Sequence, residues 1–177
     1  MFMVNVTLGI PGIFMISGDP ANVFRQLSGR SHPVAIVKRG AQGLSFDTGL
    51  TDYSGAPLTV WSLHCENHQL WYLDRRGRGT VSLRSVATGL VVSGRSAMTE
   101  GTGLTMDEWA SKPWQTWRIR PTSTKRGFAI VSADDSFRYE PLAVDVTDNA
   151  GLGSFVQVQR WRDVPSQHFL LLRVREP

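Results

Sequence analysis

One pattern occurs three times in this sequence and constrains the fold more than any other feature. Three leucines each stand 25 residues before a glutamine, and a large aromatic residue follows each glutamine by two places. The sets are Leu44, Gln69 and Trp71; Leu90, Gln115 and Trp117; and Leu142, Gln167 and Phe169. Tryptophans precede the glutamines by eight, six and six residues, at Trp61, Trp109 and Trp161. A pattern that recurs at steps of 46 and 52 residues predicts a threefold internal repeat.

Each repeat contains four short, mostly apolar stretches separated by turn residues. No segment longer than about ten residues keeps a helical apolar period without Gly or Pro, so we expect almost no helix. The expected strands are 34–37, 43–47, 57–61 and 69–73; then 80–83, 89–93, 104–109 and 115–119; then 128–131, 142–146, 155–161 and 167–174. Regularly spaced short strands of this kind indicate a closed all-β barrel or a sandwich.

The length of the repeat narrows the choice of architecture. A repeat of this length is also typical of a propeller blade. Three blades are too few to close a ring, whereas three four-stranded units can close one barrel. We therefore predict an all-β chain whose residues 33–177 form a β-trefoil, with repeats at 33–78, 79–126 and 127–177.

Residues 1–32 precede the repeats and are predicted to form an N-terminal extension of short strands. Apolar, partly alternating stretches at 12–16 and 23–27 lie on either side of a turn at Gly18-Asp19-Pro20. They form either an extra hairpin or strands that complete an irregular first repeat. Such an appendage covers either the open end of its own fold or a second copy of the chain, so a homodimer through this segment is one expectation.

The repeated apolar residues predict a single core. We expect three leucines in mid-strand and three aromatic residues to point inward: Leu44, Leu90, Leu142, Trp71, Trp117 and Phe169. Burial of each aromatic side chain contributes about 1.5–3 kcal/mol to stability. Because Cys65 is the single cysteine, no intramolecular disulfide can form, and the fold must depend on this core.

Charge and the N-terminal sequence bear on partners and location. The net charge of +4 suggests nucleic-acid binding, but the arginines are scattered and the one cluster, Arg75-Arg76-Gly77-Arg78, is typical of a solvated turn. We therefore expect no nucleic-acid partner. The apolar N-terminus has no basic segment and is broken by Pro11 and Gly12, which fits neither a signal peptide nor a membrane span. We expect no membrane insertion and a cytoplasmic or non-classically secreted protein.

The sequences Gln-x-Trp, Gln-x-Trp and Gln-x-Phe after the three leucines give the chain a family resemblance. Over about residues 33–174 it resembles the ricin B-chain-like family of β-trefoil lectins, whose repeats each carry a Gln-x-Trp signature. The resemblance implies a lectin that binds galactose- or N-acetylgalactosamine-type glycans or glycoproteins without catalysis and without a cofactor. In that family an aspartate at the end of the second strand, an aromatic residue on the third strand and polar groups before the fourth strand bind the sugar. A sugar ring has an apolar face that stacks on an aromatic ring and hydroxyl groups that can donate to a carboxylate.

The third repeat matches this pattern best. By the resemblance Asp145 would accept hydrogen bonds from sugar hydroxyl groups, Trp161 would be the stacking platform, and Gln159 would donate from the side. Ser166 and Gln167 occupy the final position, where the family usually has asparagine before glutamine.

The first repeat is a partial match. Asp47 and Trp61 are present, His68 stands in place of the asparagine before Gln69, and Thr59 replaces the side-on glutamine. By the resemblance these residues would form a second sugar site.

The second repeat departs most from the pattern. Ser93 occupies the aspartate position, although Asp107 and Trp109 remain on the expected third strand, and we predict no sugar site there. A purely structural interpretation is also open in every repeat. The tryptophans could be half-buried strand residues, and the two strand-end aspartates could be turn residues.

Other candidate sites receive less support. His64 and His68 in His64-Cys65-Glu66-Asn67-His68 have a spacing that would converge on a metal in a helix, but here it falls in a loop between strands. Neighbouring residues of an extended chain point apart, so we expect no metal site and no Cys–His catalytic pair. No Gly-x-Ser-x-Gly, Walker loop or dinucleotide fingerprint is present, and we expect no enzyme activity.

Two other functions remain open because a β-trefoil does not by itself define a function. One is a protein-binding module such as a protease inhibitor, with Arg95–Gly103 and Ala133–Glu140 as candidate loops. The other is a scaffold subunit of a toxin assembly, docked through the apolar N-terminal segment.

Overall fold

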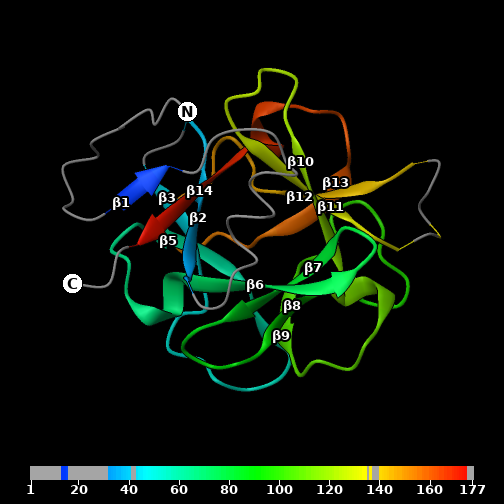
Figure 1. Ribbon diagram of the computed structural model, residues 1–177, viewed down its shortest axis with the longest axis horizontal. Coiled ribbons are helices and arrows are strands. Elements are labelled where there is room, and N and C mark those ends of the chain that lie inside the picture. Colours follow the sequence, from blue (N-terminus) through cyan, green and yellow to red (C-terminus); the bar gives the residue numbers. More distant parts are fainter. Residues whose placement is uncertain (1–12, 16–31, 41–42, 135, 137–139, 175–177) are drawn as a thin grey trace.

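The structure of the protein is a computed structural model, shown in Figure 1, and it describes residues 13–15, 32–40, 43–134, 136 and 140–174. The described residues form strands and short 3₁₀ helices, and no α-helix occurs among them. The predicted all-β fold class is therefore confirmed. No helix within the described ranges has the length and apolar character needed to cross a membrane.

The elements follow the three repeats in order. The first repeat contains β2 (Val34–Lys38), β3 (Leu44–Asp47), β4 (Ala56–Pro57), β5 (Thr59–Ser62), η1 (Asn67–Gln69) and β6 (Leu70–Gly77). The second contains β7 (Thr80–Ser85), β8 (Val91–Ser93), β9 (Thr105–Asp107), η2 (Pro113–Gln115) and β10 (Trp117–Pro121). The third contains β11 (Phe128–Ser132), β12 (Leu142–Asp145), β13 (Gln157–Arg160), η4 (Pro165–Gln167) and β14 (Phe169–Val174). Each repeated glutamine ends a 3₁₀ helix, so the prediction that it begins the fourth strand was wrong by one or two residues.

The outer strands of the repeats close a barrel. Antiparallel pairs run from β2 to β6, β7, β10, β11 and β14, and β14 pairs with β2 again. The inner strands form one hairpin in each repeat, β3–β5, β8–β9 and β12–β13. A closed barrel with three hairpins is the predicted β-trefoil (Figure 1).

The three hairpins meet in a ring of backbone hydrogen bonds. The N–H of Leu58 donates to the carbonyl of Leu104, Leu104 donates to Val156, and Val156 donates back to Leu58, at 2.9, 2.9 and 3.0 Å. All three side chains are buried. The third repeat therefore lies directly against the first, and its residues can contribute to the first repeat's surface.

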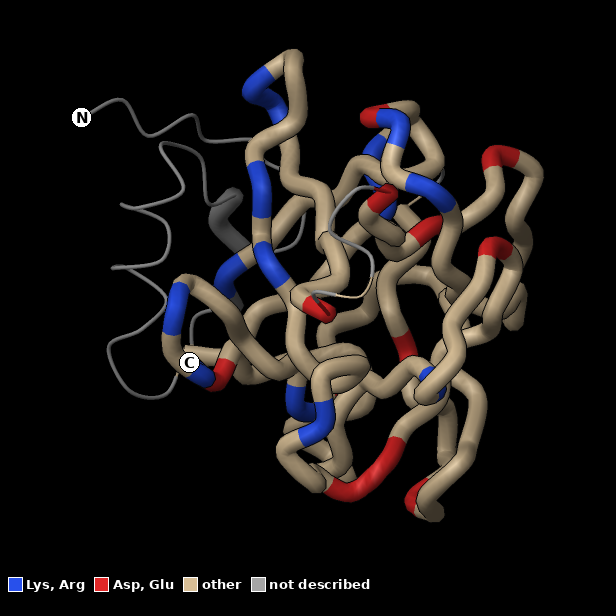
Figure 2. The backbone as a smooth tube through the Cα atoms, turned by 90° about the vertical axis from the view of Figure 1, so that its right-hand side faces the viewer, with Lys and Arg blue, Asp and Glu red and all other residues tan. Residues whose placement is uncertain are grey.

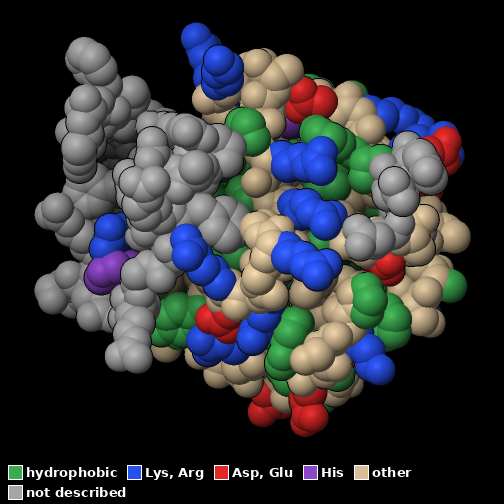
Figure 3. All heavy atoms as spheres, turned by 45° about the vertical axis from the view of Figure 1, so that its right-hand side comes forward, with side chains coloured by type: hydrophobic (Ala, Val, Ile, Leu, Met, Phe, Trp, Pro, Cys, Tyr) green, Lys and Arg blue, Asp and Glu red, His purple; other side chains and the backbone are tan. Residues whose placement is uncertain are grey.

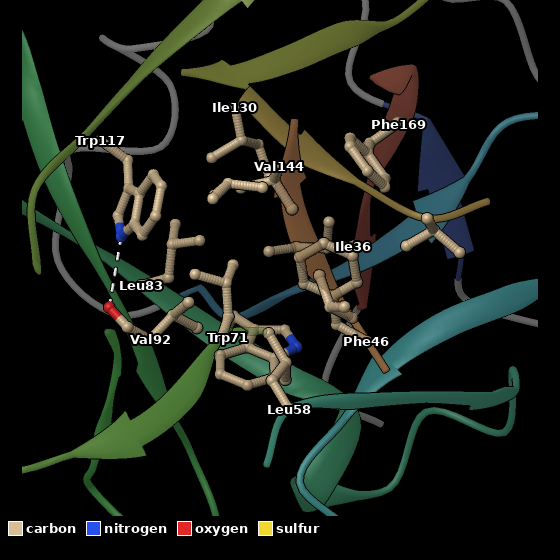
Figure 4. Close-up of a cluster of buried hydrophobic side chains, with 14 of the residues drawn as sticks. Ile36, Phe46, Leu58, Trp71, Leu83, Val92, Trp117, Ile130, Val144 and Phe169 are labelled. Carbon is tan, nitrogen blue, oxygen red and sulfur yellow. Dashed lines mark hydrogen bonds between the residues drawn. The ribbon is translucent and has the colours of Figure 1, made fainter. Parts of the chain in front are cut away.

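The core contains most of the residues predicted to point inward. Leu44, Leu142 and the three aromatic residues after the glutamines are buried, and Figure 4 shows Trp71, Trp117 and Phe169 pointing into the same cluster. Leu44 and Leu142 begin their strands, so their predicted mid-strand position was wrong. Leu90 precedes β8 and is only partly buried against the core.

The described part of the N-terminal extension is strand β1 (Ile13–Met15). It pairs antiparallel with β14, with Met15 opposite Leu172, and so extends the sheet of its own chain. The expected stretch at 23–27 lies outside the described residues. The boundary at residue 32 and a dimer through this segment stay predictions.

Charged side chains are spread over the surface. Figure 2 shows acidic and basic residues distributed around the described backbone, and Figure 3 shows several basic side chains in a row on one face. Many arginines have acidic neighbours: Arg84 lies 2.6 Å from Asp74, and Arg160 lies 3.1 Å from Glu140. The absence of a nucleic-acid partner stays a prediction.

Candidate functional site

In the first repeat, β3 and β5 bring three of the predicted site residues together. Asp47 ends β3 and pairs in register with Thr59 on β5. Trp61 follows Thr59 by two residues and shares its outward face, because alternate residues of a strand point to the same side. Trp61 is 45% exposed, which is unusual for a residue of this size. An acidic group and an open aromatic ring therefore lie on the same hairpin.

The Asp47 carboxylate is buried and held in place by two donors. The N–H of Gly49 donates to Oδ1 at 2.5 Å, and the side-chain amide of Gln69 donates to Oδ2 at 2.8 Å. The loop glycine and the repeated glutamine thus fix the orientation of the carboxylate. A carboxylate can accept about four hydrogen bonds, so Asp47 retains capacity for further donors.

His64 and His68 also converge on Asp47, which corrects the expectation that loop residues here point apart. Their Nε2 atoms lie 3.7 and 3.8 Å from Asp47 Oδ2, and the two ring centroids are 4.7 Å apart. Cys65 adopts a φ of 61° and the η1 turn follows, so the chain bends back on itself. Partial burial raises the pKa of the Cys65 thiol, which keeps it protonated at neutral pH.

The third repeat brings Asp145 and Ser166 together, as predicted. Asp145 ends β12 and is buried, and the Ser166 hydroxyl donates to its Oδ2 at 2.7 Å. Gln159 on β13 pairs in register with Ala143, two residues before Asp145, and is half-buried. The carboxylate and the hydroxyl therefore lie in contact, and Gln159 lies on the neighbouring strand of the same hairpin.

The stacking tryptophan of the third repeat is covered. The Arg120 guanidinium carbon lies 4.8 Å from the ring centre of Trp161, and the ring also packs against the buried Ala129, Val131 and Ala143. Trp109 in the second repeat is covered in the same way by Arg76 at 3.9 Å. Cation–π contacts of this kind are worth about 0.5–1 kcal/mol at exposed sites, and a ligand would have to displace them.

The strand register shows that Trp61 is not equivalent to Trp109 and Trp161. In the first hairpin Trp61 lies opposite Ser45. The equivalent residue of the second hairpin is Asp107, which lies opposite Val91, and that of the third is Gln159, which lies opposite Ala143. All three stand eight residues before the repeated glutamine. Trp109 and Trp161 stand six residues before it, and the first repeat has Leu63 at that place, packed against a small apolar cluster. The sequence match of the three tryptophans was therefore wrong in the first repeat.

The repeated glutamines are buried and bonded to the backbone of the preceding loop. The side-chain oxygen of Gln69 accepts from the backbone N–H of His64, and the side-chain oxygen of Gln167 accepts from the backbone N–H of Arg162. Gln115 accepts from Ala110 in the same way. Because none of these amides reaches the surface, we assign Gln69 and Gln167 to positioning the site. A direct contact of either with a sugar stays a prediction.

The second repeat has a serine at the end of β8, where the other two repeats have an aspartate, as predicted. Ser93 pairs with Thr105 in the register that Asp47 and Thr59 occupy in the first repeat. The Asp107 carboxylate instead accepts from the hydroxyls of Ser54 and Thr105, at 2.9 and 2.8 Å. Strand β8 of this repeat therefore ends without the carboxylate that ends β3 and β12.

Comparison with known families decides the classification. The family described as ricin-type beta-trefoil lectin domain-like matches residues 34–107 and 67–161, which together make up more than half of the chain. The chain belongs to this family. The resemblance inferred from the repeated glutamine motif is thereby confirmed for this ricin-type domain.

Solved structures with the same fold agree with the family assignment. A ricin B-like lectin of Macrolepiota procera in complex with lactose has 18% identity and a TM-score of 0.66, with 81% of this chain and 95% of that chain covered. An earthworm R-type lectin C-half in complex with GalNAc has 17% identity and a TM-score of 0.61, with 81% and 99% covered. The exo-beta-1,3-galactanase 1,3Gal43A of Clostridium thermocellum has 18% identity and a TM-score of 0.73, with 83% of this chain but 31% of that chain covered. A search of curated protein sequences found no match.

Two contributions to the first site of this ricin-type domain were missed in the sequence. His64 was considered only for a metal spacing and a Cys–His pair, both of which were rejected, and the proximity of His64 to Gln69 in the loop was the available signal. The third repeat supplies a neighbouring loop in which Gly153 faces Trp61 and Phe155 pairs with Thr59. Phe155 is 66% exposed, but no local pattern in the sequence links it to the first repeat.

Proposed function

We propose that the protein is a non-catalytic lectin and that its main carbohydrate site is the first repeat, formed by Asp47, Thr59, Trp61 and His68. The observation that carries the proposal is the exposed Trp61 ring on the same hairpin as the fixed Asp47 carboxylate. Arginine side chains lie over the rings of Trp109 and Trp161, whereas no arginine of the described residues lies over the ring of Trp61.

The roles follow from the chemistry of a sugar ring. Trp61 offers an aromatic face to the apolar C–H face of the ring. Asp47 accepts from vicinal hydroxyl groups, and its existing donors Gly49 and Gln69 hold it ready for them. His68, with its Nε2 at 3.8 Å from Asp47, can donate to a hydroxyl or accept from one.

The third repeat is the second candidate. Asp145, Gln159 and Ser166 supply the polar groups there, but Trp161 is occupied by Arg120. We propose that this site binds more weakly than the first repeat. The second repeat lacks the strand-end carboxylate and is proposed not to bind.

We propose galactose- or N-acetylgalactosamine-type glycans as ligands. Support comes from the relatives of the same fold that were solved with lactose and with GalNAc. A shallow site with one stacking ring and one carboxylate is expected to bind in the high-micromolar to millimolar range, about −4 to −6 kcal/mol. Two sites on one chain, or two chains in a dimer, would raise the effective affinity for a multivalent glycan.

The protein-binding alternative receives no specific support from the described loops. The Arg95–Gly103 loop is tied to the third repeat by the bond from Gly101 N–H to the Val158 carbonyl at 2.8 Å, whereas an inhibitory loop must project from the surface. Most of the Ala133–Glu140 loop falls in or beside residues 135 and 137–139, which are not described.

A glycan array tests the proposal. Wild type should bind galactose- or N-acetylgalactosamine-terminated glycans, and Trp61→Ala and Asp47→Asn should lose most of this binding. Trp109→Ala is the matched control, because it removes the same side chain from a repeat without the carboxylate, and it should bind as wild type does. Circular dichroism confirms that each variant is folded.

Two outcomes would contradict the proposal in different ways. A folded wild type that binds no glycan would exclude the lectin function. Binding that persists in Trp61→Ala and vanishes in Trp161→Ala would keep the lectin function but move the main site to the third repeat.

A further inference from the structure

His64, His68 and Asp47 form a cluster that goes beyond the requirements of a sugar site. Each offers one ligand atom, and these three atoms all lie within 4.8 Å of one another. The two imidazole Nε2 atoms both face the same carboxylate oxygen, at 3.7 and 3.8 Å. Two imidazoles and one carboxylate are a ligand set that zinc commonly has in proteins.

The spacing is close to that of a bound zinc ion. Ligands at 2.0–2.1 Å from a tetrahedral ion lie about 3.3 Å from one another. The two histidine-to-aspartate distances exceed this by about 0.4–0.5 Å. All three ligand atoms lie within 4.8 Å of one another, so side-chain rotations that bring the two imidazoles closer together would close the site. The histidine side chains are 33% and 21% exposed, so an ion can enter and water can serve as the fourth ligand.

The surrounding groups already orient one ligand and place a carboxylate near a second. Gln69 and Gly49 fix the Asp47 carboxylate through hydrogen bonds. The Glu66 carboxylate lies 3.9 Å from Nδ1 of His68, on the side of the ring away from Asp47. This distance is too long for a hydrogen bond, but a small rotation of the exposed Glu66 side chain would let its carboxylate accept a hydrogen bond from Nδ1–H and leave the Nε2 lone pair for a metal, as in many zinc sites.

His64 must change its hydrogen bonding when a metal binds. Its Nδ1 accepts the N–H of Glu66 at 3.3 Å, a long bond. Ligation through Nε2 places a proton on Nδ1, so this bond is given up. Glu66 is exposed, and water can satisfy its freed N–H.

We propose that Asp47, His64 and His68 form a binding site for one divalent zinc ion, with water completing the coordination. Calcium and magnesium prefer oxygen ligands and do not suit a site with two imidazoles. The site arises from the left-handed turn at Cys65 and from the η1 helix, which bring the two rings together. The proposal concerns metal binding alone and holds whether or not the first repeat binds sugar.

Isothermal titration of the full chain with zinc chloride, without any sugar, tests the site. Wild type should bind one zinc ion per chain, and its thermal unfolding midpoint should rise with zinc concentration. His64→Gln and His68→Gln should each weaken binding about tenfold or more. Both histidines are partly exposed, so these variants should fold, and circular dichroism checks that they do.

His32→Gln is the matched control, because His32 is exposed and belongs to no ligand cluster among the described residues. It should bind zinc as wild type does. No zinc binding by wild type would overturn the proposal. Equal zinc binding by wild type, His64→Gln and His68→Gln would also overturn it, and so would an equal loss in His32→Gln. Failure of this test leaves the glycan-array result untouched, since the titration contains no sugar.

Discussion

The side-chain amide of Gln69 donates a hydrogen bond of 2.8 Å to Oδ2 of Asp47. The same amide donates to the Ser62 carbonyl, and its oxygen accepts from His64 and Cys65. One residue of the fold signature therefore connects the strand-end carboxylate with the loop that carries both histidines. The equivalent amides Gln115 and Gln167 bond to the backbone carbonyls of Glu108 and Arg160.

Gln69→Ala should destabilise the protein by about 2–4 kcal/mol, because it removes partners from several buried polar groups. Urea unfolding measures this cost. Gln115→Ala is the matched control, since it should destabilise similarly but leave Asp47 in place. Folded Gln69→Ala should lose glycan binding and Gln115→Ala should keep it; equal binding by the two would show that Asp47 needs no support from Gln69.

Two tryptophan truncations should separate stability from binding. Trp117 is fully buried and its indole N–H donates to the Val92 carbonyl, so Trp117→Ala should cost about 3–5 kcal/mol. Trp61 is exposed, so Trp61→Ala should change the free energy of unfolding by less than about 0.5–1 kcal/mol while it abolishes glycan binding. Denaturant unfolding monitored by circular dichroism gives both values. A large loss of stability in Trp61→Ala would show that Trp61 has a structural role.

Asp163 should contribute stability that depends on pH. Partial burial raises the pKa of Asp163, but hydrogen bonds from Ser123 and His168 outweigh this and lower the pKa below its ordinary value. A carboxylate with a lowered pKa stabilises the fold above its ordinary pKa, and this stability is lost as the pH falls through the folded-state value.

Asp163→Asn removes that contribution with little backbone strain, because asparagine tolerates the positive φ of 53° at this position. Wild type should therefore be more stable than Asp163→Asn at about pH 5, and the difference should shrink as the pH falls toward about 2. Urea unfolding across this range measures it. A difference that does not vary with pH would mean that the charge of Asp163 is unimportant.

Zinc and sugar should compete for the first repeat, a prediction that rests on both proposals because both sites use Asp47. Saturating zinc should weaken glycan binding by wild type about tenfold or more, the effect of removing one charged acceptor. His64→Gln keeps Asp47, Trp61 and His68, so its glycan binding should not respond to zinc. Titration of a hit glycan with and without zinc makes the comparison. Zinc-bound protein with unchanged glycan affinity would show that the carboxylate is not shared.

The fold could be predicted from the sequence because its determinants repeat along the chain. Trp71, Trp117 and Phe169 follow the glutamines at one spacing, and all three are buried in one core. The positions of Asp47 and Asp145 at strand ends were also predicted correctly, since each is the last residue of a short buried strand. Hydrophobic periodicity and turn residues act locally, and these features depend on little else.

The site was less predictable because it depends on register and on contacts between repeats. Counting back from the glutamines equated Trp61 with Trp161, whereas the pairing of Trp61 with Ser45 and of Gln159 with Ala143 separates them by two positions. A shift of two residues keeps a side chain on the same face of a strand but moves it to a different neighbour. Arg120 could not be assigned to Trp161 from the sequence, since they belong to different repeats.

The sequence by itself determined the threefold repeat, most of the inward-facing residues it predicted and the resemblance to the family. Those properties follow from the spacing of apolar residues. The free energy gained by burying apolar surface is non-directional, so it depends little on the conformation of the loops. The tertiary structure alone decided which tryptophan is open and that His64 and His68 face Asp47. The reason is geometric: a positive φ at Cys65 and pairing between distant strands set side-chain directions that no local pattern encodes.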